Sequence, residues 1–199
     1  MSTPEFIAFP KMPRLSRDCI ITEKIDGTNA QICITEDGEL FAGSRSRWVT
    51  VSDDNYGFAG WCHRNHDELM KLGPGRHFGE WWGQGIQRNY GLKEKRFSLF
   101  NVERWCLHGQ EPKQIPSSDS KTVKLQGVLP ECVGLVPVLM RCEFDTMNIV
   151  GVLDDLAAYG SHAAPGFMKP EGIVVFHIAG NFGFKKTIER DAEPKGLPQ

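Results

Sequence analysis

The stretch that most constrains the fold of this chain is residues 22–29, TEKIDGTN, where a lysine stands between an apolar run and a glycine turn. Residues 19–21 are apolar and β-rich, and residues 30–35 alternate well enough to form a second strand. Lys24 therefore ends a buried strand, and Gly27 permits a tight turn because it has no Cβ. Taken alone, the pattern also fits a surface lysine beside a turn, so its meaning depends on the rest of the chain.

Length and composition limit the class of protein. The chain has 199 residues and is 40% hydrophobic, which suits one globular domain with its own core. No apolar run approaches a membrane span, and residues 1–5 lack the start of a signal peptide. The six cysteines show no Cys-x-x-Cys spacing, and residues 62–66, CHRNH, lack further zinc ligands at a sensible spacing. We therefore expect a cytoplasmic protein with reduced thiols.

Charge argues against a protein that coats nucleic acid over its whole surface. The net charge is −2 and the pI is about 6.3. Local basic patches remain candidates for phosphate contacts, which position a substrate rather than read its sequence. These patches are Arg14 with Arg17, Arg45 with Arg47, residues 93–96, and Lys185 with Lys186.

The periodicity of the chain predicts alternating strands, turns and two helices. Residues 35–39 are typical of a hairpin turn before a strand at 40–43, and residues 53–55 can cap a helix over 56–72. A second helix follows Asp145 and ends at Gly160, whereas residues 108–126 read as a polar, turn-rich segment. Further strands are expected at 97–105, 135–144, 171–176 and 182–188, with a loop at 161–169 beside the cleft.

Residues 22–29 resemble the Lys-x-Asp-Gly attachment motif of the covalent nucleotidyltransferase superfamily, which includes ATP-dependent RNA ligases, DNA ligases and mRNA capping enzymes. The flanking residues look most like the RNA ligases that seal nicks in duplex RNA. The resemblance implies that the amine of Lys24 attacks the α-phosphate of ATP, so that pyrophosphate leaves and lysyl-AMP remains. Lysine suits this role because its pKa moves readily when it is desolvated or faces other cations.

Further motifs in the family's order extend this resemblance over about residues 20–188. Residues 76–83 resemble the third motif, which gives Glu80 a contact with the ribose, and Phe100 is the candidate for stacking on the adenine, with Phe97 as the alternative. Residues 171–176 resemble the fourth motif, which makes Glu171 the ligand of a divalent metal. The resemblance further implies that Asp26 assists the later steps, that Glu23 lies near the adenine, and that Asn29 and Arg45 contact the nucleotide or RNA end. Arg47 is the alternative to Arg45.

The fifth motif departs from the usual pattern. The family carries two lysines separated by one residue, whereas Lys185 and Lys186 are adjacent and should point to opposite sides of a strand. Lys186 shares a side with Phe182 and Phe184, which should seek the core. We therefore predict that Lys185 faces the nucleotide and acts on its phosphate, while Lys186 lies at the rim or reaches an RNA phosphate.

The resemblance implies an α+β nucleotidyltransferase domain, with mostly antiparallel sheets framing a nucleotide cleft and helices packed outside. We expect residues 1–199 to form this single domain, without a separate C-terminal RNA-binding domain. The expected activity is ATP-dependent RNA ligation with Mg²⁺ or Mn²⁺, joining an RNA 5′-phosphate to a 3′-hydroxyl. The alternatives are a DNA ligase, a GTP-dependent capping-type enzyme, or a non-catalytic nucleic-acid-binding module on the same fold.

Overall fold

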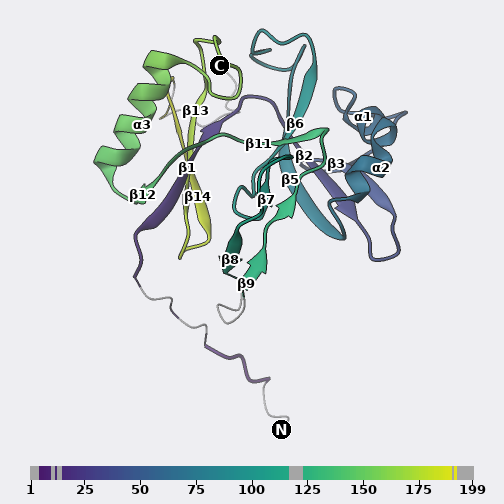
Figure 1. Cartoon of the computed structure of the whole chain (residues 1–199), viewed down its shortest axis with the longest axis horizontal. Coiled ribbons are helices and arrows are strands. Elements are labelled where there is room, and N and C mark those ends of the chain that lie inside the picture. Colours follow the sequence, from purple (N-terminus) through teal and green to yellow (C-terminus); the bar gives the residue numbers. More distant parts are fainter. Residues whose placement is uncertain (1–4, 10–11, 13–14, 117–122, 190, 192–199) are drawn as a thin grey trace.

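The computed structural model describes residues 5–9, 12, 15–116, 123–189 and 191. Two main sheets lie side by side (Figure 1). The smaller has the order β12 (Val138–Glu143), β1 (Asp18–Lys24), β13 (Gly172–His177) and β14 (Phe182–Thr187). The larger has the order β11 (Val133–Leu135), β6 (Lys95–Leu99), β5 (Gly75–Gly83), β2 (Thr28–Ile34), β3 (Leu40–Ser44) and β4 (Trp48–Val49). Within these two sheets the pairing is antiparallel except between β11 and β6.

The chain passes from one sheet to the other directly after Lys24. β1 belongs to the four-stranded sheet and β2 to the six-stranded sheet, with residues 25–27 between them. This crossing brings the backbone of Gly27 very close to β5. A Cβ at Gly27 would stand 2.5 Å from the carbonyl oxygen of Trp81 and 2.7 Å from Cβ of Trp82. The glycine is therefore required because the two backbones pass too close for a side chain.

The helix expected over residues 56–72 is two short helices instead. α1 (Phe58–Arg64) and α2 (His66–Met70) meet at Asn65, whose side-chain amide donates to the carbonyl of Trp61 at 2.9 Å. Such a local side-chain bond competes with the helical ladder and ends it. The N-cap position of α1 is Gly57 rather than a residue of 53–55, but the Asp54 carboxylate still accepts bonds of 2.8 and 2.9 Å from the first-turn N–H groups of residues 59 and 60.

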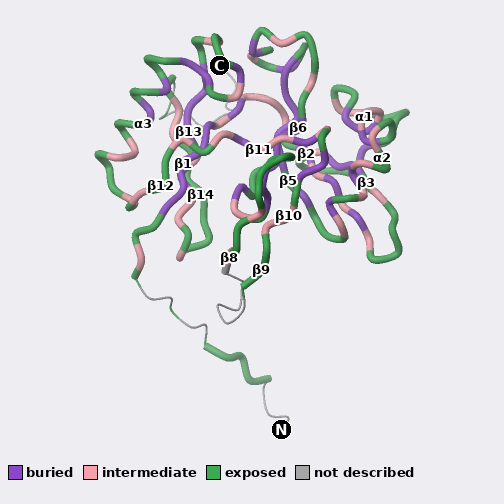
Figure 2. The backbone as a smooth tube through the Cα atoms, in the orientation of Figure 1, coloured by how far each residue is buried: buried purple, intermediate pink, exposed green. Residues whose placement is uncertain are grey.

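Each main sheet buries one face against helices, and Figure 2 shows burial following their central strands. The core of the six-stranded sheet joins residues of β2, β5 and β6 to Phe58, Cys62 and Leu69 of the two short helices. α3 (Thr146–Tyr159) covers the four-stranded sheet, with Val152 and Leu156 packed among residues of β1 and β13. As predicted, Asp145 caps α3 by accepting from two N–H groups, at 2.6 and 3.2 Å, and Gly160 follows its last residue.

Two expected strands are shorter than predicted. Residues 135–144 do not form one strand: β11 pairs with β6 in the larger sheet, and β12 pairs with β1 in the smaller. The break falls at Val136 and Pro137, and a proline has no N–H to continue a ladder. The strand expected over 97–105 ends at Leu99, after which the chain turns.

The segment over 108–126 contains more regular structure than its composition indicated. Within the segment, β8 (Gln114–Pro116) pairs with β9 (Val123–Leu125). On either side of it, β7 (Trp105–Cys106) pairs in parallel with β10 (Gly127–Val128). Residues 117–122 lie outside the described part. The hairpin turn at 35–39 is confirmed, since Ile34 of β2 pairs with Leu40 of β3.

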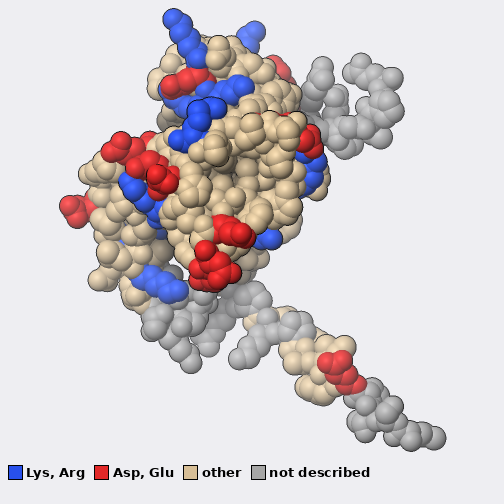
Figure 3. All heavy atoms as spheres, turned by 90° about the vertical axis from the view of Figure 1, so that its right-hand side faces the viewer, with Lys and Arg blue, Asp and Glu red and all other residues tan. Residues whose placement is uncertain are grey.

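The charged side chains do not form one continuous basic surface on the face seen in Figure 3. Groups of lysine and arginine and groups of aspartate and glutamate lie among one another on this face, and uncharged area separates many of them. This distribution agrees with the net charge of −2. In the described part of the chain, no helix has the length and apolar composition needed to cross a membrane.

Candidate active site

A large cleft of about 1620 Å³ opens between the two sheets. The four-stranded sheet contributes side chains of β1, β13 and β14, and the six-stranded sheet contributes side chains of β2 and β5. Small-molecule pockets usually have volumes of about 300–1,000 Å³, so this cleft has room for more than one nucleotide. The residues predicted for the site that line it are Glu23, Lys24, Asp26, Asn29, Arg45, Glu80, Phe100, Glu171 and Lys185.

The Lys24 amine lies against a buried carboxylate. Its Nζ stands 2.5 Å from Oε2 of Glu171, and the side chains are 20% and 3% exposed. The two residues meet because β1 pairs with β13 so that Lys24 lies opposite Gly172, directly after Glu171. Charge-assisted bonds of this kind are short and strong, and the pair holds the amine at the start of the turn to β2.

Glu80 approaches the same turn from the other sheet. One of its carboxylate oxygens accepts a 3.0 Å hydrogen bond from the N–H of Gly27. Burial raises the pKa of Glu80 to about 7, and the nearby carboxylates of Glu171 and Asp26 act in the same direction, while the Lys24 charge and the Gly27 N–H oppose it. Glu80 is therefore poised between its neutral and charged forms near neutral pH.

Asp26 is held by two residues that the sequence analysis did not single out. Arg88 donates from Nε to the Asp26 carboxylate at 3.0 Å and from Nη1 to the carbonyl of Lys169 at 3.1 Å. The hydroxyl of Tyr90 accepts from the Asp26 N–H at 2.8 Å. Both belong to a loop in which Gln87, Asn89 and Tyr90 have positive φ angles of 44°, 60° and 51°.

Glu23 faces away from Lys24, because successive residues of a strand point to opposite sides. Its carboxylate accepts from the Ser161 hydroxyl at 2.5 Å and from the N–H groups of His162 and Ala163 at 2.8 Å each. The side chain is 1% exposed, and these three donors satisfy a buried charge. Glu23 thus holds the 161–163 loop against β1, and its contact with an adenine stays a prediction.

Two choices left open by the sequence, Arg45 or Arg47 and Phe100 or Phe97, differ in where the structure places their side chains. Arg45 lines the cleft, whereas Arg47 makes two bonds of 2.7 and 3.0 Å to the carboxylate of Asp53. Phe100 lines the cleft and is 42% exposed, whereas Phe97 is 1% exposed in the core of the six-stranded sheet. The placements of Arg45 and Phe100 leave both free to meet a ligand.

The two adjacent lysines of β14 point to different sides. Lys185 lines the cleft, and Lys186 forms a 2.9 Å ion pair with Asp191. The premise that the neighbouring phenylalanines seek the core was wrong, since Phe182 and Phe184 are 61% and 48% exposed. β14 is the edge strand, and α3 packs against β13 and β12. The ring of Phe184 therefore contacts Phe182 and Phe144 while a large part of both β14 rings stays exposed.

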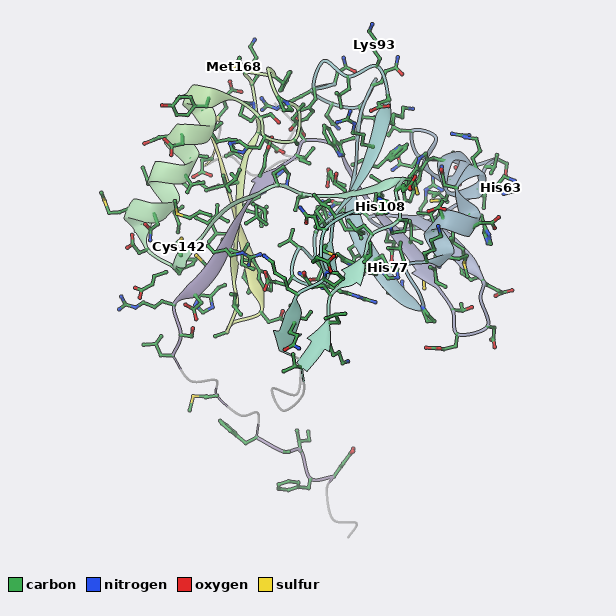
Figure 4. The ribbon with its side chains drawn as sticks, in the orientation of Figure 1. His63, His77, Lys93, His108, Cys142 and Met168 are labelled. Carbon is green, nitrogen blue, oxygen red and sulfur yellow. The ribbon has the colours of Figure 1, made fainter. Side chains whose placement is uncertain are left out.

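The described residues contain no group of three or more His, Cys, Asp or Glu side chains placed to hold a metal ion. His63 lies on α1 at one edge of the molecule, apart from His77 (Figure 4). Glu171, inside the cleft, is a hard carboxylate ligand of the kind that Mg²⁺ and Mn²⁺ accept when phosphates and water complete the shell.

A model of the RNA ligase family matches residues 17–187 of this chain. The chain belongs to the RNA ligase family. This assignment covers both main sheets and every strand that lines the cleft. No curated protein sequence matches the chain.

Solved structures of a Naegleria gruberi RNA ligase share the fold of this RNA ligase family member. A variant with ATP and Mn aligns with a TM-score of 0.57 and 21% identity, covering 87% of this chain and 50% of that one. A variant with AMP and Mn gives 0.56 and 21%, covering 86% and 49%. The likeness shows the fold, mostly antiparallel sheets with few helices, and the present chain spans about half the length of those proteins.

Proposed function

We propose that this member of the RNA ligase family is an ATP-dependent RNA ligase that works through a lysyl-AMP intermediate on Lys24. The observation that carries the proposal is the convergence of Lys24, Glu80, Glu171 and Lys185 on one cleft, although they come from strands far apart in the chain. The family match and the ATP-containing structures of the same fold support it.

The reaction has three steps. The Lys24 amine attacks the α-phosphate of ATP, so that an N–P bond forms, the bond to the bridging oxygen breaks, and pyrophosphate leaves. The AMP group then passes from Lys24 to an RNA 5′-phosphate, which regenerates the amine. In the last step an RNA 3′-hydroxyl attacks that phosphate, a phosphodiester forms, and AMP departs.

Attack requires a neutral amine, so Lys24 must give up a proton and leave its contact with Glu171. The Glu171 carboxylate, 2.5 Å away, is placed to accept that proton and pass it to solvent, and the ionised carboxylate would then be available to coordinate a divalent cation. Glu171 would hold Mg²⁺ or Mn²⁺ together with phosphate oxygens, and the cation would neutralise charge on those phosphates. Lys185 lies in the same cleft and would stabilise charge that develops on the α-phosphate.

Glu80 and Phe100 would bind the nucleoside, the first through a ribose hydroxyl and the second by stacking on the adenine. Arg88 would orient Asp26 for the steps that involve RNA, because its guanidinium holds that carboxylate on one side. Asn29 and Arg45 would contact the nucleotide or the RNA end.

The test is incubation of purified protein with ATP labelled at the α-phosphate and Mg²⁺ or Mn²⁺, followed by a denaturing gel and intact mass. We expect a covalent AMP adduct that maps to Lys24 and is absent from Lys24→Ala. Lys71 follows α2, is paired with Glu68 and does not line the cleft, so Lys71→Ala is the matched control and should label like wild type. Circular dichroism and melting curves of Lys24→Ala establish that the variant is folded.

Retained labelling of Lys24→Ala would overturn the choice of nucleophile. An adduct formed only with GTP would indicate a capping-type enzyme, and sealing of nicked DNA but not RNA would indicate a DNA ligase. Absence of any adduct, once mass had excluded prior adenylation, would indicate a non-catalytic binding module.

Lys185→Ala and Lys186→Ala form a second matched pair. If Lys185 stabilises the α-phosphate, its removal should slow adenylation by about 100-fold or more, as for other lost electrostatic contacts in active sites. Lys186→Ala should have a much smaller effect on this step, because its amine is paired with Asp191. Equal losses in the two variants would contradict the assignment.

A further inference from the structure

The outward face of the six-stranded sheet carries an unusual set of exposed aromatic side chains. Phe41 on β3, Trp48 on β4, Phe78 on β5 and Phe100 after β6 are 42%, 46%, 52% and 42% exposed. We call these four residues the aromatic face. Register places Phe78 and Trp48 on one side of the sheet, since Gln31 of β2 lies opposite both Phe78 and Gly43, and Gly43 lies opposite Trp48. Phe41 is two positions from Gly43 on β3, and the N–H of Phe100 donates to the carbonyl of Phe78. The short helices pack on the other side, among the alternate residues.

Contacts within the sheet hold Trp48 in place. Its ring lies 5.8 Å from the ring of Phe41, and the guanidinium of Arg76 stands 5.3 Å from its centroid. Arg76 in turn donates to the side-chain carbonyl of Gln31 at 3.0 Å. A Cβ on Gly43 would lie 3.0 Å from the Trp48 ring, so the glycine lets the indole lie across its strand. The large side chain is therefore ordered before any ligand arrives, which lowers the entropic cost of binding.

The aromatic face continues directly into the cleft that contains Lys24. Phe78 and Phe100 line that cleft, together with three arginines, Arg45, Arg76 and Arg104. Glu103, a carboxylate on the same stretch of wall, is paired with Arg141. This end of the cleft therefore offers positive charge beside exposed rings, in a protein whose overall charge is −2.

Aromatic rings next to arginines on an open sheet are the features that bind single-stranded nucleic acid, because bases stack on rings and phosphates pair with guanidinium groups. The distance along β2 from Asn29 to Cys33 is about 13 Å, which has room for roughly four bases stacked at about 3.4 Å. Beyond it lies the hairpin turn with Glu36, Asp37 and Glu39, whose charges would repel phosphates.

We propose that the aromatic face binds a short single-stranded segment of RNA next to the end that is joined, with bases on Trp48 and Phe78 and phosphates on Arg45 and Arg76. The proposal rests on the proposed function for its choice of RNA end. Under this proposal, the six-stranded sheet itself provides a surface that binds RNA. The binding itself is measured without ATP, so the two proposals are tested separately.

Trp48 provides its own signal. Of the five tryptophans, Trp81, Trp82 and Trp105 are buried, Trp61 is partly buried, and Trp48 alone is exposed. We expect a 5′-phosphorylated hexauridine to quench tryptophan fluorescence on titration. Trp48→Ala should weaken binding of the fluorescently labelled oligonucleotide about 5- to 150-fold, the usual range for one lost base stack. Trp48→Phe should keep most of the affinity and lose the quenching.

Two further variants distinguish binding from a general effect on structure. Arg76→Gln should weaken binding and lower the slope of log affinity against log salt by about 0.7, the value for one phosphate contact on a single strand. Tyr159→Ala removes a 77% exposed aromatic ring from α3, on the other sheet, and should bind like wild type. Melting curves confirm that each variant is folded.

Equal affinity of wild type and Trp48→Ala, or no binding of the oligonucleotide by wild type, would overturn this proposal and leave the aromatic face to a protein partner. An AMP adduct on Lys24 in the same preparation would then keep the proposed function intact. Conversely, binding that depends on Trp48 and Arg76 without any adduct would support the RNA surface while the proposed ligase activity fails.

Discussion

Replacement of Glu80 by glutamine should change how the stability of the protein depends on pH. Glu80 is 8% exposed, and burial raises its pKa from 4.5 to about 7. Between these two values the folded protein keeps the proton while the unfolded chain has released it. Because the folded state binds more protons there, its stability falls as pH rises, and the loss is complete above about pH 7.

The size of this loss follows from the two pKa values. Each unit between them corresponds to 1.36 kcal/mol, so the rise from 4.5 to about 7 costs the folded state about 3 kcal/mol at pH 8. Glutamine keeps a carbonyl oxygen for the N–H of Gly27 and cannot ionise. The difference in free energy of unfolding between Glu80→Gln and wild type should therefore shift by about 3 kcal/mol in favour of the variant between pH 4.5 and pH 8.

Urea unfolding at several pH values, followed by tryptophan fluorescence, measures this difference. Glu39→Gln makes the same chemical change in the exposed hairpin turn and controls for the loss of a charge at the surface. A difference between Glu80→Gln and wild type that stays constant with pH would refute the reasoning. The reasoning would also be refuted if wild type became more stable relative to the variant as pH rises. In that case the neighbours of Glu80 would stabilise its carboxylate by more than burial destabilises it.

Three further substitutions test contacts around the site. Ser161→Ala removes a buried donor to Glu23 and should destabilise the protein by about 1–3 kcal/mol in thermal or urea unfolding, whereas an unchanged midpoint would deny that this bond holds the loop. Arg88→Gln frees one side of Asp26, so sealing of a pre-adenylated RNA should slow at least tenfold while self-adenylation of the enzyme changes less; equal losses in both steps would contradict a positioning role. Asp145→Ala removes the cap of α3 and should cost about 1 kcal/mol by the same unfolding assays, with a loss below 0.3 kcal/mol counting against the cap.

The parts of the fold that depend on neighbouring residues could be predicted from the sequence. The hairpin at 35–39, the cap at Asp145, the end of α3 before Gly160 and the strands at either side of Lys24 all rest on interactions within a few positions of the chain. Predictions failed where a local break was missed, at Asn65 and Pro137, and where a distant partner decided the outcome. Pro137 ends one strand so that the chain can change sheets, and the exposure of Phe184 depends on where α3 lies.

The site shows the same division. Residue types and their order in the chain were sufficient to propose Lys24, Glu80 and Glu171 as chemical groups. Only the tertiary structure could place Lys24 against Glu171 across 147 positions, or bring Arg88 to Asp26 across 62. The reason is physical: alternation and capping act over one turn or one strand, whereas the distance between two charges depends on how the sheets pack and on which face each strand buries.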